Sequence, residues 1–149
     1  MPREQSDEAQ WWFNAVYEAV QQVPRGRVTS YKHIAVLLGY PKRARQVGVC
    51  LKHLPDFNPA EPDKFFFHSD NVPWQRVINS KGGISPRGDG GLAANRQVAA
   101  LRAEGVEVTD GHGLEEAHVD FSRYGWFPDR LPNEPDESDE SDDDSKPGG

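Results

Sequence analysis

Apolar residues near the N-terminus recur at spacings of three and four, the repeat of one face of an α-helix. The positions are Phe13, Val16, Val20 and Val23. Ser6 or Asp7 suits the N-cap of such a helix, and Pro24 stands just after its last apolar residue. The pattern therefore predicts an amphipathic helix over residues 7–23.

A shorter helical pattern begins after a turn at residues 24–26. Ser30 or Thr29 can cap it, and it runs over residues 31–38. Its apolar face consists of Ile34, Leu37 and Leu38. Gly39 is typical of a helix that ends in the left-handed conformation.

A second short helix is predicted directly afterwards, over about residues 42–54. Pro41 suits its start, where a missing backbone N–H is no loss. Its apolar positions are Val47, Val49, Cys50 and Leu54. Two short helices joined by a glycine-containing turn form a helix-turn-helix.

The middle of the chain predicts a long loop and a small wing. Residues 55–71 are rich in proline and acidic residues, and we expect a surface loop whose aromatic run Phe65–Phe67 anchors it on the body. Residues 76–85, "RVINSKGGIS", predict a strand, a glycine turn and a second strand, which is a β-hairpin or wing.

The last apolar patterns follow this wing. A helix is predicted over residues 92–104 with Val98 and Leu101 as its apolar stripe, closed by Gly105. Residues 106–108 predict a last strand. A final aromatic group should pack on the body, and its members are Phe121, Tyr124, Trp126 and Phe127.

Charge divides the chain into two parts. Residues 133–149 hold eight acidic residues and one lysine, so this segment carries −7, while the other residues hold 16 basic and 16 acidic side chains. Because the segment has no large apolar residue, we predict one domain over residues 7–132 and a disordered acidic tail over 133–149. The tail suits a solubilising, partner-binding or nucleic-acid-mimicking role, or phosphorylation at Ser138, Ser141 and Ser145.

Within the neutral body, positive charge gathers on the second helix of the helix-turn-helix. Its basic residues are Lys42, Arg43, Arg45 and Lys52. Such residues near the start of a recognition helix pair naturally with DNA phosphates. An ordinary solvated helix face is the alternative that charge alone leaves open.

Other chemistry has little support. Five histidines without a metal-binding spacing and a single cysteine argue against a zinc site, and we expect no cofactor. His53 follows Cys50 closely enough to lower a thiol pKa, but the apolar neighbours favour a buried structural cysteine. No apolar run is long enough to span a membrane and no segment resembles a signal peptide, so a soluble intracellular protein is expected.

The stretch "VPWQRVINSKGGIS", residues 72–85, presents a residue on a loop between an apolar segment and a turn. Together with "GRVTSYKHIA", "PKRARQVG" and "LRAEGVEV", it resembles the C-terminal domain of the O6-alkylguanine-DNA alkyltransferases over about residues 13–108. The resemblance implies a mostly α fold with a small β-wing, a winged helix-turn-helix of the alkyltransferase type. The loop 55–71 is an insertion relative to that family.

The family's motif Pro-Cys-His-Arg-Val supplies a nucleophilic cysteine, a histidine that relays a proton and a glutamate that orients the histidine. Here the cysteine position is Trp74, the histidine position is Gln75, and only the glutamate remains, as Glu104. Indole is no nucleophile and glutamine is no base. The chain therefore resembles the alkyltransferase-like proteins, which bind alkylated guanine without transferring the alkyl group.

The resemblance also assigns roles by position. Tyr31 corresponds to the tyrosine that helps rotate a nucleotide out of the duplex, and Arg45 to the arginine that fills the gap. Ala44 and Gly48 allow close approach to the minor groove, beside Lys42 and Arg43 as further DNA contacts. The lesion pocket is expected to consist of Tyr31, Pro73, Trp74 and Arg87.

The sequence thus predicts a non-enzymatic sensor that flips O6-alkylguanine out of duplex DNA and channels it to nucleotide excision repair. The partners would be lesion-containing DNA and repair proteins, and the protein a monomer without metal. It would act in the nucleus of a eukaryote, otherwise in the cytoplasm. Two alternatives stay open: a DNA-binding regulator without lesion specificity, and a residual transferase that uses Cys50.

Overall fold

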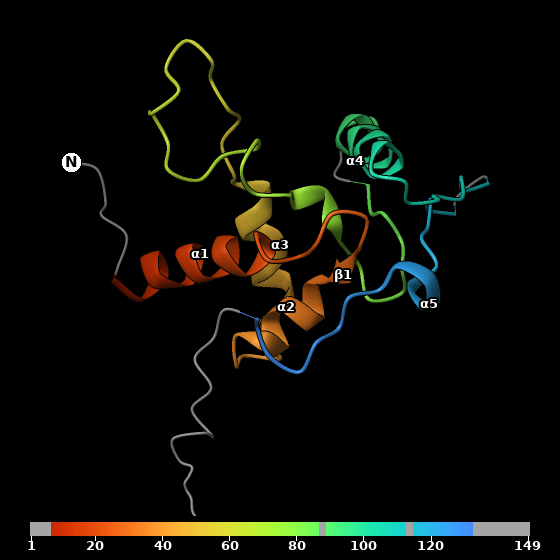
Figure 1. The fold of residues 1–149 in the computed structure, drawn as a ribbon, viewed down its shortest axis with the longest axis horizontal. Helices are drawn as coiled ribbons and strands as arrows, with labels where there is room; N and C mark the ends of the chain where they lie inside the picture. The colour runs from red at the N-terminus through yellow and green to blue at the C-terminus, as the bar shows by residue number, and fades with distance from the viewer. Residues whose placement is uncertain (1–6, 87–88, 113–114, 133–149) are drawn as a thin grey trace, which may run out of the picture.

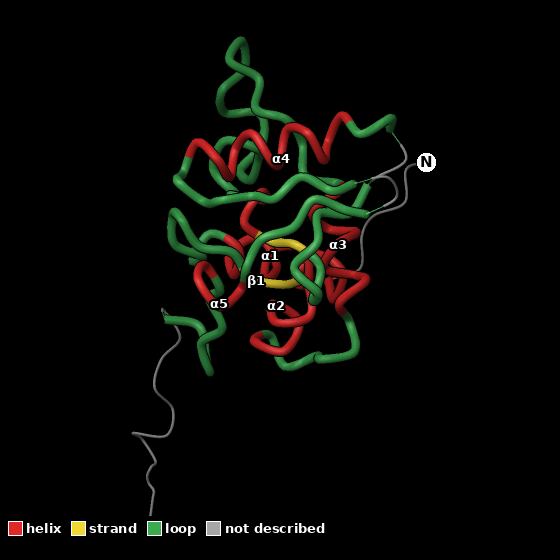
Figure 2. Tube along the Cα trace, turned by 90° about the vertical axis from the view of Figure 1, so that its right-hand side faces the viewer, coloured by secondary structure: helices red, strands yellow, loops and turns green. Residues whose placement is uncertain are grey.

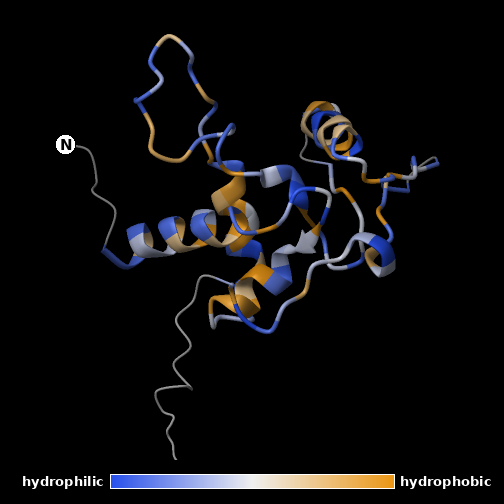
Figure 3. Cartoon of the chain, viewed as in Figure 1, coloured by the Kyte–Doolittle hydropathy of each residue, from blue (hydrophilic) through white to orange (hydrophobic). Residues whose placement is uncertain are grey.

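A computed structural model describes residues 7–86, 89–112 and 115–132. Three helices pack together in the N-terminal half: α1 (Asp7–Val20), α2 (Tyr31–Leu37) and α3 (Ala44–Lys52). Figure 1 shows α1 lying across α2 and α3. The predicted first helix is confirmed, although it ends three residues early. Figure 3 shows hydrophobic and hydrophilic residues alternating around α1, as its sequence period requires.

The helix-turn-helix is confirmed, with a shifted second helix. Ser30 caps α2, because its Oγ accepts a hydrogen bond from the His33 N–H at 2.9 Å, and Gly39 has a φ of +87°. The Arg43 N–H bonds to the Tyr40 carbonyl at 2.9 Å in a turn, so α3 begins at Ala44 rather than at residue 42. Val49, one of the predicted apolar positions, is exposed.

The small sheet exists, but its pairing differs from the predicted hairpin. β2 (Val77–Ile78) runs parallel to β1 (Thr29–Ser30), as the adjacent yellow segments of Figure 2 show. The turn after β2 forms, since the Asn79 N–H bonds to the Gly83 carbonyl at 3.1 Å. Its far side then pairs with residues 117–119 instead of returning along β2. Both strand residues of β2 are buried, so tertiary packing decides the partner.

The C-terminal half adds a second apolar cluster. α4 (Leu92–Ala103) ends as predicted: Gly105 has a φ of +88°, and the Val106 N–H bonds to the Leu101 carbonyl at 3.1 Å. The predicted strand at 106–108 is wrong, because the chain makes only a single bridge there, from Thr109 to His118. The predicted aromatic group packs on the body near α5 (Phe121–Tyr124): Phe121 and Tyr124 join the second cluster, Trp126 joins the N-terminal core, and Phe127 is exposed but contacts the rings of His33 and Phe121 at 5.2 and 5.0 Å between centroids.

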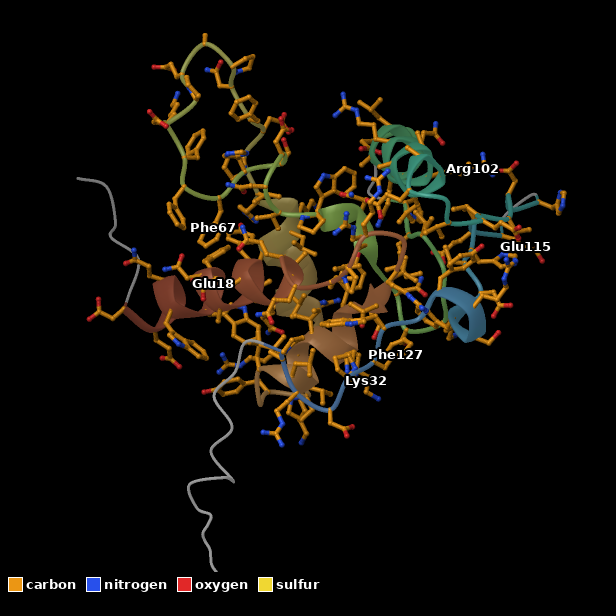
Figure 4. All side chains as sticks on the ribbon, viewed as in Figure 1. Glu18, Lys32, Phe67, Arg102, Glu115 and Phe127 are labelled. Atoms are coloured by element: carbon orange, nitrogen blue, oxygen red, sulfur yellow. The ribbon has the colours of Figure 1, made fainter. Side chains whose placement is uncertain are left out.

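The predicted loop 55–71 projects from the body between α3 and the turn that holds Trp74 (Figure 1). Of its three consecutive phenylalanines, only Phe67 is an anchor, and its ring centroid lies 5.3 Å from that of Tyr17. Figure 4 labels Phe67 where the loop meets α1. Phe65 and Phe66 are exposed, Phe66 to 82%, so the prediction of a three-residue anchor is wrong. The tail from residue 133 lies outside the described residues.

Candidate nucleic-acid interface

Four of the residues predicted to contact DNA lie in one place. Tyr31, at the start of α2, meets Ala44, Arg45 and Gly48 of α3 around a hollow of about 560 Å³. A Cβ added to Gly48 would lie 3.9 Å from the Tyr31 ring, so the partly exposed glycine lies next to the tyrosine. Packing of α2 against α3 thus brings an aromatic ring and a guanidinium to one hollow.

The other two predicted DNA contacts lie elsewhere. The Arg43 guanidinium stacks 4.4 Å from the Tyr40 ring centroid and 5.2 Å from that of Trp12. Lys42 and Arg43 line a separate hollow beside the turn before α3. Because α3 begins only at Ala44, Arg43 turns toward α1 and has a packing role.

Trp74 begins the 3-10 turn η1 (Trp74–Arg76), directly after Pro73. Its half-buried ring packs against the core of the N-terminal half and lines a hollow of about 320 Å³. The other walls come from α3, loop 55–71 and the start of α4. In the described part of the chain, Trp74 and Tyr31 line two different hollows, and Arg87 lies outside the described residues.

Glu104 lies in a hydrogen-bond network that includes the two residues after Trp74. Its carboxylate accepts hydrogen bonds from Gln75 Nε2 at 2.7 Å, from Arg76 Nε at 3.0 and 3.1 Å, and from the Gly26 N–H at 2.9 Å. Burial by itself would raise the pKa of Glu104, but these hydrogen bonds and the Arg76 charge outweigh burial and lower the pKa. The carboxylate therefore stays ionised and fixes the backbone that carries Trp74.

Sequence reasoning missed a second support of this turn. Gln97 of α4 is fully buried, and its Nε2 donates to the carbonyls of Gln75 and Val77 at 3.1 and 2.9 Å. Gln97 stands four residues before Leu101, on the buried stripe of the helix. A glutamine at that place in the pattern is a signal that could have been noticed.

The family model described as "6-O-methylguanine DNA methyltransferase, DNA binding domain" matches residues 11–106. The chain belongs to this family. Among family members, Alkyltransferase-like protein 1 of Schizosaccharomyces pombe is 39% identical over 117 residues, which are 78% of this chain and 95% of that protein. The DNA base-flipping protein of Escherichia coli is 38% identical over 127 residues, 85% of this chain and 83% of that protein.

The fold also matches a solved structure of the family. The crystal structure of S. pombe Atl1 in complex with damaged DNA containing O6-carboxymethylguanine has a TM-score of 0.64 and 38% identity to this chain. The match covers 84% of this chain and the whole of that chain. The predicted alkyltransferase-like type of helix-turn-helix fold is confirmed by these likenesses.

Within this family, the protein is a member that does not transfer alkyl groups. Trp74 stands where the resemblance places the nucleophilic cysteine, and Cys50 lies elsewhere, buried in α3. Burial raises the pKa of the Cys50 thiol to about 11, so the thiol stays protonated and shielded from DNA. His53 does not activate it, because its Nδ1 lies 2.9 Å from the Val49 carbonyl oxygen. The prediction of a buried structural cysteine is confirmed.

No group of three or more metal-ligating side chains comes together among the described residues. Nor is any helix in the described ranges long and apolar enough to cross a membrane.

Proposed function

We propose that the protein is a non-enzymatic sensor of O6-alkylguanine in duplex DNA. The observation that carries the proposal is Trp74, which follows Pro73 at the position of the family's nucleophile and lines a hollow beside α3. A flat indole can hold a flat base by stacking, which contributes about 1–3 kcal/mol per base. The same position cannot accept an alkyl group, so the protein binds the lesion and leaves it intact.

Binding at Trp74 requires that the base leaves the stack, because a stacked guanine takes part in base pairing and presents O6 to the major groove, on the side opposite to the minor groove that the family's recognition helix approaches. Flipping costs a few kcal/mol, and less for a base that pairs badly, as an alkylated guanine does. Tyr31 presses on the backbone of the flipped nucleotide, and Arg45, exposed on α3 in the same hollow, enters the gap. Ala44 and Gly48 leave room for close approach. Trp74, Pro73 and Arg87 then hold the base.

A bound lesion that is not repaired in place has to be passed on. We infer that the protein marks the site for nucleotide excision repair, acting as a monomer, in the nucleus where the cell has one. The relatives' names support the first part of this chain of events, because one is a DNA base-flipping protein and another has been crystallised on damaged DNA.

The test is binding to two duplexes that are identical except for one O6-methylguanine, at a stated salt concentration because DNA affinity depends steeply on salt. The intact mass of the protein is recorded afterwards. We expect tighter binding to the lesion and no mass gain. Equal affinity for both duplexes would favour a DNA-binding regulator without lesion specificity, and a methyl mass increase would reveal a transferase.

A further inference from the structure

The hollow beside Trp74 has one wall that belongs to the inserted loop. Its apolar part consists of Leu51 and Leu54, next to the indole. Asp56, Ser69 and Asp70 come from the two ends of loop 55–71, and Arg96 comes from α4. The two ends of the insertion, where it joins the body, therefore complete the hollow in which the proposed function places the lesion.

Hydrogen bonds fix the residues on either side of Asp56 and Asp70. The Ser69 N–H bonds to the Pro55 carbonyl at 2.9 Å, and the Phe57 N–H bonds to Ser69 Oγ at 3.0 Å, which closes the loop at its base. Gln21, directly after α1, donates from Nε2 to the Asn71 carbonyl at 3.0 Å. Asp56 and Asp70 each stand between residues that are held in this way, so the backbone that carries them stays at the hollow they line.

The charges around the hollow are unequal. Asp56, Asp70 and Arg96 are exposed residues that line the hollow beside the Trp74 indole, so its described lining holds two acidic residues and one basic residue. A neutral substituent entering this space meets apolar side chains and hydrogen-bonding groups. Among the described lining residues, an anionic substituent meets one more acidic than basic side chain, and charges a few ångström apart still repel although water screens them.

We propose that Asp56, Asp70 and Arg96 determine which O6 substituents the protein accepts, favouring neutral groups over anionic ones. This inference rests on the proposed function, because it concerns the substituent of the guanine held at Trp74. The aspartates disfavour an anionic substituent and Arg96 opposes them. Since these groups lie on the inserted loop and on α4, the selectivity is set by side chains away from the DNA-facing hollow of Tyr31 and Arg45.

The experiment uses the full chain and three duplexes that differ in one base: guanine, O6-methylguanine or O6-carboxymethylguanine. The readout is the ratio of the Kd values for the two lesions. We expect the wild type to bind the methyl lesion about three- to tenfold more tightly than the carboxymethyl lesion. The double variant Asp56→Asn/Asp70→Asn should bring the ratio close to one, and Arg96→Gln should widen it.

Asp63→Asn is the matched control, because Asp63 is an exposed acid of the same loop that does not line the hollow. It changes the charge of the loop and should leave the ratio unchanged. If Asp63→Asn shifts the ratio as strongly as the double variant, or if the double variant and Arg96→Gln leave it unchanged, the inference is overturned while lesion sensing stands. If the wild type does not distinguish O6-methylguanine from guanine, the proposed function fails as well. Thermal unfolding of each variant verifies that the fold is retained.

Discussion

Trp74 is the residue on which the proposed function depends. It is half-buried, so it can be part of the core and also offer a face to the hollow beside it. Its place at the start of η1 is fixed from behind by Gln97, which bonds to the carbonyl of the next residue. A rigid aromatic wall of this kind loses little entropy when a base stacks on it.

Replacing Trp74 by alanine should remove lesion discrimination. The stacking surface is lost, so we expect affinity for an O6-methylguanine duplex to fall by about 1–2 kcal/mol, roughly five- to thirtyfold. Affinity for the unmodified duplex should change much less. Trp74→Phe, which keeps an aromatic face, should retain most of the preference in the same binding assay. Equal behaviour of the alanine and phenylalanine variants would argue against stacking.

Two arginines near each other in the sequence should respond differently. Arg45 faces the hollow with Tyr31, so Arg45→Ala should weaken lesion binding by about 1–2 kcal/mol without loss of thermal stability. Arg43 stacks on Tyr40 and Trp12, so Arg43→Ala should cost about 1 kcal/mol of folding free energy. Calorimetry and duplex titration on both variants separate the two roles. A loss of binding confined to Arg43→Ala would reverse this assignment.

At the scale of elements, the helix-turn-helix contains two glycines that are present for different reasons. Gly39 ends α2 in the left-handed region, at a φ of +87°. Gly48 lies inside α3, where glycine has the poorest propensity of any residue but proline. Its presence there is explained by the surface it leaves open beside Tyr31, and not by the backbone.

Alanine substitutions at these glycines should therefore change stability in opposite directions. Gly48→Ala should stabilise the fold by about 0.5–1 kcal/mol, because the added Cβ makes ordinary contact with Tyr31 at 3.9 Å. The same change should weaken DNA binding, since it fills the surface of closest approach. Gly39→Ala should destabilise by about 1 kcal/mol although space is free there. Denaturant unfolding measures both, and a stabilising Gly39→Ala would contradict the argument.

At the scale of the whole molecule, Glu104 joins parts that are far apart in the sequence. Its carboxylate accepts hydrogen bonds from the Gly26 N–H and from the side chains of Gln75 and Arg76, which both belong to η1. Only 4% of the Glu104 side chain is exposed. Arg76 also donates to the Val23 carbonyl at 2.8 Å. The glutamate that orients a catalytic histidine in the transferases here stabilises the junction of three segments.

Glu104→Gln should cost about 2–4 kcal/mol at neutral pH, because it leaves the largely buried Arg76 charge unpaired. The folded-state pKa of Glu104 is lowered, so its stabilisation is complete above its unfolded pKa of about 4.3. That stabilisation is lost as the pH falls through the folded-state pKa. The difference in unfolding free energy between wild type and variant should thus be constant from about pH 8 to 5 and shrink below about pH 4. Glu107→Gln, in an exposed pair with Arg123, is the control and should change little.

Removal of the acidic tail, residues 133–149, should change DNA binding but not stability. Truncation after Pro132 removes a charge of −7 and keeps Leu131, which is buried in the N-terminal core. We expect unchanged thermal stability and tighter, strongly salt-dependent binding to unmodified DNA. Duplex titration at two salt concentrations tests whether the acidic tail limits non-specific binding to DNA. Unchanged affinity would leave the solubilising and partner-binding roles.

The sequence by itself determined the features that depend on neighbouring residues. The helices, the Ser30 cap, the glycine ends of α2 and α4 and the chemistry excluded by Trp74 all follow from spacing and residue type. Local hydrogen bonds and side-chain periodicity act over a few residues, so a single chain displays them.

Only the tertiary structure decided which distant segments meet. β2 pairs with β1 instead of its own hairpin, Arg43 turns to Trp12, and Asp56 and Asp70 of the inserted loop reach the hollow of Trp74. The bond between Gln75 and Glu104 spans 29 residues. Such contacts depend on which apolar surfaces pack together, and periodicity in one segment does not specify its partner.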